Sequence, residues 1–135
     1  MESTATVAGV SGAPSSGFGM VLNRPVNAPG RVAGAGLLLI AAAVYLLAGG
    51  VWWSGLALLF VPDLGAIGFG FGPRIGVAAY NAAHRLPIPA SLLAAGLVAG
   101  WRPVALAGLI WLGHIGMDRA LGYGLKDVQL DGRRS

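Results

Sequence analysis

Cysteine is absent from the 135 residues of this sequence. Its absence excludes a disulfide framework and any metal site built on thiolate ligands. Charge is also scarce, because Asp, Glu, Lys and Arg make up only 10% of the chain, whereas an ordinary soluble domain carries about 25%. So few charges cannot cover a surface that faces water on all sides. The composition therefore excludes an ordinary soluble protein and predicts that lipid covers the surface.

The positive charges that are present do not form a patch. The chain has a net charge of +4, and most of its basic residues stand alone beside apolar runs. Isolated basic residues in such positions follow the positive-inside rule of membrane proteins and are a poor match for a phosphate backbone. We therefore expect the lipid bilayer as a partner and no nucleic acid. These basic residues are Arg24, Arg31, Arg74, Arg85, Arg102, Arg119 and Lys126.

Apolar runs dominate the rest of the chain. A helix needs about 20 apolar residues to cross a bilayer. Four runs approach that length: 32–48, 52–72, 74–100 and 104–125. We predict an all-α fold, a polytopic transmembrane helical bundle of about four spans, with the third span broken or kinked near Pro87 and Pro89. The alternative for the third run is a short amphipathic helix followed by a shorter span.

The ends of the chain differ from its middle. Residues 1–30 are rich in Gly, Ser, Ala and Pro, and we expect a disordered tail there. Residues 31–126 form the predicted transmembrane domain, and residues 127–135 a polar C-terminal tail. With both termini in the cytoplasm, Arg102 is the only basic loop residue outside, so the Lys and Arg distribution favours that orientation.

Small residues are dense within the apolar runs. Gly68 and Gly72 are spaced i, i+4, and so are Gly96 and Gly100. One interpretation is close packing of helices within one subunit, and the other is a homo-oligomer that uses these Gly-rich helix faces.

Four ionisable residues interrupt the runs at similar depths. At 1.5 Å per residue, Asp63, His84, His114 and Asp118 lie roughly 12–18 Å from the cytoplasmic ends of their spans. His114 and Asp118, at i and i+4, share a helix face. Imidazole and carboxylate groups suit a divalent metal, namely zinc, manganese or iron. The polar residues nearest these four in sequence, which would surround such a metal site, are Asn81, Arg85 and Arg119.

A second interpretation explains the same residues without a metal. Asp63 and Asp118 can neutralise Arg85 and Arg119, because two acids and two bases balance in charge. The histidines are then neutral, hydrogen-bonded packing residues, and the protein is a non-catalytic membrane protein whose buried network is structural. Both interpretations stay open at this point.

Four segments carry a resemblance to a known family: Phe60–Asp63, Gly72–Arg74, Tyr80–His84 and Trp111–Lys126. Together they resemble the uncharacterised bacterial membrane family catalogued as domain of unknown function 4260. The resemblance implies a multi-pass protein of the bacterial inner membrane and no particular chemistry. Members of that family tend to carry a Glu early in the first span, where this chain has Ala33.

A weaker resemblance points to an activity. Pro62-Asp63, His84-Arg85 and the pair His114 and Asp118 are similar to motifs of predicted membrane-bound metal-dependent hydrolases, although the further histidines of that family are absent here. This resemblance implies hydrolysis of a lipid-like or membrane-embedded substrate. Whichever of the two acids is not a ligand would then be the general base.

Overall fold

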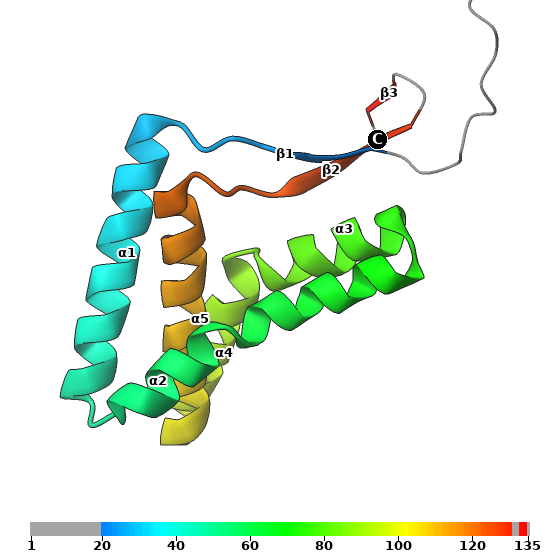
Figure 1. Ribbon diagram of the computed structural model, residues 1–135. Helices are drawn as coiled ribbons and strands as arrows, with labels where there is room; N and C mark the ends of the chain where they lie inside the picture. Colours follow the sequence, from blue (N-terminus) through cyan, green and yellow to red (C-terminus); the bar gives the residue numbers. More distant parts are fainter. Residues whose placement is uncertain (1–19, 131–132, 135) are drawn as a thin grey trace, which may run out of the picture.

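The computed structural model describes residues 20–130 and 133–134 of the chain (Figure 1). Helices account for most of these residues, which confirms the predicted all-α fold, and the strands are short. The elements in chain order are β1 (Met20–Asn23), α1 (Ala28–Leu47), α2 (Trp52–Leu59), the 3-10 helix η1 (Val61–Phe71), α3 (Pro73–Ala83), α4 (Pro87–Val98), α5 (Arg102–Leu121), β2 (Lys126–Leu130) and β3 (Arg133–Arg134).

Three helical segments are long and apolar enough to cross a membrane. They are α1, the continuous segment Trp52–Phe71 made of α2 and η1, and α5, with 20 residues each. A fourth apolar helix, α4, has only 12 residues. The prediction of a polytopic membrane bundle is thus confirmed, and its count of about four spans corresponds to three long segments and one short helix.

The predicted break in the third run lies just before Pro87. Helix α3 ends at Ala83 and α4 begins at Pro87. Proline lacks an N–H and disfavours helical geometry in the residue before it, so a helix that meets a proline ends and a new one starts there. His84 occupies the C-cap of α3 and therefore lies at this break.

Helices α1 and α5 run side by side, with α5 in the middle of the bundle and α1 at its edge (Figure 1). Gly116 of α5 packs directly against the backbone of α1. A Cβ added there would lie 2.7 Å from the carbonyl oxygen of Gly34 and 2.7 Å from the nitrogen of Leu38. Only glycine permits so close an approach. This contact fixes α5, and with it the two residues His114 and Asp118 on either side of Gly116.

The four glycines singled out in the sequence have two different roles. Gly68 packs on Ala79 of α3, and Gly96 packs on the backbone of Ala105 in α5, so both serve contacts within one chain. Gly72 and Gly100 have positive φ values of 112° and 64° at the ends of their segments. A homo-oligomer contact through these faces stays a prediction.

A small sheet joins the two ends of the described chain. β1 pairs antiparallel with β2, and β3 pairs with the far edge of β2. Arg24, which follows β1, donates to both carboxylate oxygens of Asp127 at 2.6 and 3.0 Å. This hydrogen bond raises the pKa of Arg24 above its ordinary value, so the pair stays charged. Residues 20–23 and 126–130 are thereby held together at one end of α1 and α5.

This sheet differs from the expectation for the tails. Of residues 1–30, expected to be disordered, residues 20–23 form β1 and residues 28–30 begin α1, while residues 1–19 lie outside the described part. Asn27 caps α1 by accepting a hydrogen bond from the N–H of Gly30 at 2.9 Å. Residues 127–130 of the expected polar tail belong to β2. The cytoplasmic orientation of this end stays a prediction.

Candidate metal centre

Asp63, His84, His114 and Asp118 come together in one cluster. Each offers one ligand atom, and these four atoms all lie within 4.8 Å of one another. They come from three parts of the chain: η1, the end of α3, and α5. The convergence expected from their depths is therefore present in the structure, although no ion is part of it.

Helix α5 supplies two of the four residues from its most buried stretch. His114 and Asp118 are spaced i, i+4 and so face the same way. The His114 side chain is fully buried, and that of Asp118 is 14% exposed. The Trp111 indole, one turn earlier on α5, donates to the carbonyl oxygen of Ala83 at 2.6 Å. This bond ties the end of α3, and therefore His84, to α5.

His84 is held with its Nε2 lone pair facing the cluster. Its Nδ1 lies 2.7 Å from the carbonyl oxygen of Tyr80. A carbonyl can only accept, so Nδ1 carries a proton, and in the neutral ring Nε2 then holds the lone pair. The ring also stacks on the Tyr80 ring, with centroids 3.8 Å apart. A metal-binding histidine is commonly oriented in this way, by a backbone acceptor at its other nitrogen.

The spacing of the ligand atoms fits a small divalent cation. His84 Nε2 lies 2.9 Å from His114 Nε2, 3.1 Å from an Asp118 oxygen and 3.8 Å from an Asp63 oxygen. His114 Nε2 lies 3.5 and 3.6 Å from the same two oxygens. Metal–ligand bonds of about 2.0–2.2 Å in a tetrahedron separate the ligands by roughly 3.3–3.6 Å. These five separations scatter around that value, and the sixth, between the two carboxylates, lies within the 4.8 Å that bounds the cluster.

The cluster carries two acids, and no Lys or Arg of the described residues pairs with them. Within residues 20–130 and 133–134, the ion pairs of Asp63 and Asp118 join them only to the two histidines. Over the same residues, neither Arg85, which is exposed, nor Arg119 forms an ion pair. The competing interpretation paired the acids with these arginines, so its arginine component is missing from the part of the chain that is described.

One atom of the cluster has no hydrogen-bond partner. It is Nδ1 of the fully buried His114. If His114 binds a cation through Nε2, Nδ1 carries a proton, and if His114 instead donates from Nε2 to His84, Nδ1 is a bare acceptor. Leaving a buried polar atom unpaired is unfavourable by about 1–3 kcal/mol. The ring is therefore held in place by packing rather than by hydrogen bonding at Nδ1.

Two further residues contribute to the cluster, and the sequence analysis did not assign them to it. The Tyr80 hydroxyl donates to an Asp118 oxygen at 3.3 Å, and the Lys126 ammonium lies 4.2 Å from the centre of the Tyr80 ring. Tyr80 precedes His84 by one helical turn, and that i, i+4 spacing was the available signal. Lys126 lies beyond the last helix and gave no such signal.

Asn81 is next to the cluster in sequence but has a different partner. Its amide group donates to the Lys126 carbonyl oxygen at 2.8 Å and accepts from the Lys126 N–H at 2.7 Å. These two bonds attach the start of β2 to α3. The Asn81 side chain therefore bonds the backbone of Lys126 and does not serve as a ligand in the cluster.

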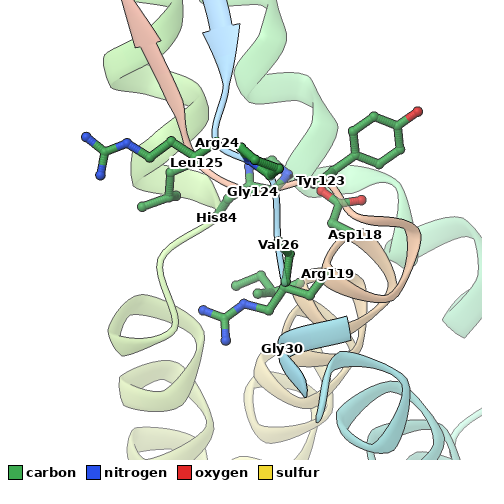
Figure 2. A pocket seen from close by; sticks show the side chains of 11 residues that line it. Arg24, Val26, Gly30, His84, Asp118, Arg119, Tyr123, Gly124 and Leu125 are labelled. Carbon is green, nitrogen blue, oxygen red and sulfur yellow. Dashed lines mark ion pairs between the residues drawn. The ribbon is translucent and has the colours of Figure 1, made fainter. Parts of the chain in front are cut away.

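A cavity of about 240 Å³ adjoins the cluster (Figure 2). Two cluster residues, His84 and Asp118, form part of its wall. The remaining lining residues come from α1, from α5 and from the segments that enter α1 and leave α5: Arg24, Pro25, Val26, Gly30, Ile115, Arg119, Tyr123, Gly124 and Leu125. A small ligand in this cavity would thus contact the candidate metal centre.

Comparison with known proteins gives one match. A family model described as "Domain of unknown function (DUF4260)" matches residues 29–130, which include all four cluster residues. No curated protein and no solved structure matches the chain significantly. The comparisons thus support the first resemblance seen in the sequence and lend no support to the resemblance to hydrolases.

Proposed function

The chain belongs to the DUF4260 family, whose function is unknown, and we infer its chemistry from its own side chains. We propose that Asp63, His84, His114 and Asp118 form a divalent-metal centre with hydrolase-like activity. The observation that carries this proposal is the convergence of two imidazole Nε2 atoms and two carboxylates that have no Lys or Arg partner among the described residues. Two acids in an apolar bundle without such a partner favour a bound cation.

The roles of the four residues follow from their exposure. Asp118 is mostly buried and accepts a hydrogen bond from Tyr80, and it is the third ligand beside His84 and His114. Two histidines with one carboxylate are a common ligand set of catalytic zinc. The Asp63 side chain is 48% exposed and is the least buried of the four, which leaves it as the general base. When bound, a divalent cation would polarise a phosphoryl or acyl oxygen and lower the pKa of a bound water.

The alternative is a metal-free structural cluster. It is favoured by the 2.9 Å contact between the two Nε2 atoms, which a hydrogen bond from His114 to His84 would also explain. In that state the two acids bind no metal, and the cluster only fixes how η1, α3 and α5 pack. The two proposals differ in one measurable quantity, the metal content.

Elemental analysis of the purified protein tests the proposal. We expect near-stoichiometric zinc, manganese or iron in the wild type, and loss of that metal in His114→Gln and Asp118→Asn, because each substitution removes a ligand. Asp127→Asn is a matched control, since this acid pairs with Arg24 outside the cluster. Wild-type protein that is empty and refuses added metal, with a chelator control, would overturn the metal centre and with it the hydrolase.

A further inference from the structure

The cavity beside the candidate metal centre has lining residues that do not belong to the centre. His84 and Asp118 of the centre form one side, and Arg24 and Arg119 are among the other lining residues. Gly30, in the first turn of α1, closes another side. Figure 2 shows these residues around the junction of the two helices with the β1–β2 ribbon.

The charge of this cavity is positive once the acids are accounted for. A divalent cation in the centre would compensate Asp63 and Asp118, and Asp127 is already bonded to Arg24. No carboxylate of residues 20–130 forms an ion pair with Arg119. A guanidinium without a carboxylate partner, in a cavity wall and beside a bound cation, complements an anion. Phosphate suits it best, because the planar fork of Arg bonds two phosphate oxygens at once.

The depth of the cavity favours a lipid as the source of that phosphate. A 20-residue helix is about 30 Å long, which is the thickness of the hydrocarbon core, so the ends of α1 and α5 lie at the level of the headgroups. The cavity lies at these ends. Apolar side chains of Val26, Ile115 and Leu125 line it together with the arginines. A cavity with both kinds of lining matches the junction between a headgroup and its acyl chains.

We propose that this cavity binds the phosphate headgroup of an anionic membrane lipid, with Arg119 as its anchor. The inference rests on the proposed metal centre, which would meet the same phosphate from the His84 and Asp118 side. It assigns the substrate class of that centre as phosphate esters carried by lipids. Arg119 has a binding role here and takes no part in proton transfer.

The test uses the full chain in nanodiscs of phosphatidylcholine with and without phosphatidic acid. Lipid retention is measured by native mass spectrometry, and inorganic phosphate is titrated as a separate arm. We expect the wild type to enrich phosphatidic acid and Arg119→Gln to weaken that binding by about tenfold to a hundredfold, the usual effect of losing a charge-assisted hydrogen bond. Arg119→Lys keeps the charge and should fall between the two.

Arg74→Gln is the matched control, because it removes the same charge from an exposed position of α3 that does not line the cavity. If anionic lipids are attracted to any basic residue, both variants should retain phosphatidic acid equally less well than the wild type. That result would overturn the proposal. Inorganic phosphate that binds as tightly as phosphatidic acid would also overturn it, in favour of a soluble ligand.

Elemental analysis of the same samples separates this proposal from the metal centre. Full metal content with no preference for phosphatidic acid would overturn the headgroup site and leave the metal centre standing. Metal-free wild type would overturn the centre instead, and the difference between Arg119→Gln and Arg74→Gln would then decide the headgroup site alone. Arg119→Gln is expected to keep its metal, since Arg119 is not a ligand.

Discussion

The two ends of the α1–α5 pair both carry polar groups, but they satisfy them differently. At one end, which we term the capped end, the Tyr45 hydroxyl bonds the Ser54 hydroxyl at 2.9 Å and donates to the Val51 carbonyl at 3.2 Å. Arg102 donates to the Ala48 carbonyl that ends α1. Tyr45, Ser54 and Arg102 are thus satisfied by a hydroxyl or by a backbone oxygen nearby.

The opposite end, the cluster end, holds Asp63, His84, His114 and Asp118. There, four atoms with lone pairs converge, and His114 Nδ1 has no partner at all. The three side chains of the capped end are completed by the protein itself. On the proposal of a metal centre, the four ligand atoms of the cluster end would instead be completed by a cation.

The largest effect is expected for Asp118→Asn, whose change in the free energy of unfolding should depend on bound metal. In metal-loaded protein we expect it to lower the free energy of unfolding by about 3–4 kcal/mol, the linked stabilisation at ligand concentrations 100–1,000 times the Kd. In chelator-treated protein the loss should be much smaller, because only the contacts of Asp118 with Tyr80 and His84 are then affected. Thermal or denaturant unfolding in detergent, with and without metal, measures both values.

Equal destabilisation in the two states would break the comparison. It would mean that Asp118 is satisfied by the protein, like the groups of the capped end. Asp127→Asn serves as the reference here as well, since its effect should not change when metal is removed.

A smaller effect is expected for Tyr80→Phe. The substitution keeps the ring that stacks on His84 and removes the hydroxyl that donates to Asp118. Loss of a partner behind a metal ligand typically weakens metal affinity by about 10–100-fold. Competition with a chelator of known affinity measures the change. An affinity equal to that of the wild type would show that the hydroxyl does not orient Asp118.

The smallest effect sharpens the contrast from the other end. Tyr45→Phe removes the hydroxyl that bonds Val51 and Ser54, and we expect a loss of about 1 kcal/mol in unfolding free energy, as for a typical hydrogen bond. Metal content and metal affinity should stay unchanged, because this group lies at the opposite end of α1. A loss of metal in Tyr45→Phe would contradict the separation of the two ends.

Local patterns in the sequence were sufficient for much of this architecture. The lengths of the apolar runs gave the membrane helices, and Pro87 marked the break between α3 and α4. Similar depths brought together Asp63, His84 and the i, i+4 pair His114 and Asp118. These inferences use helix geometry, which acts over a few residues, and the depth argument also uses the orientation predicted from Lys and Arg.

Contacts between distant segments could not be predicted in the same way. Strand β1 has four residues, and it depends on β2 at the other end of the chain. Asn81 looked like part of the cluster but bonds the backbone of Lys126, and Arg119 turned out to line the cavity without pairing with an acid. Such details depend on which side chains meet after the helices have packed, and no short sequence pattern records that.

The pairing of β1 with β2 also sets an order of events during synthesis. Arg24 and Asp127 are 103 positions apart, so the ribosome completes every helix between them before the ion pair can form. Until then β1 has no neighbour, and the cavity lacks its wall around Leu125. The helices between Arg24 and Asp127 are therefore made first, and the cavity is completed last.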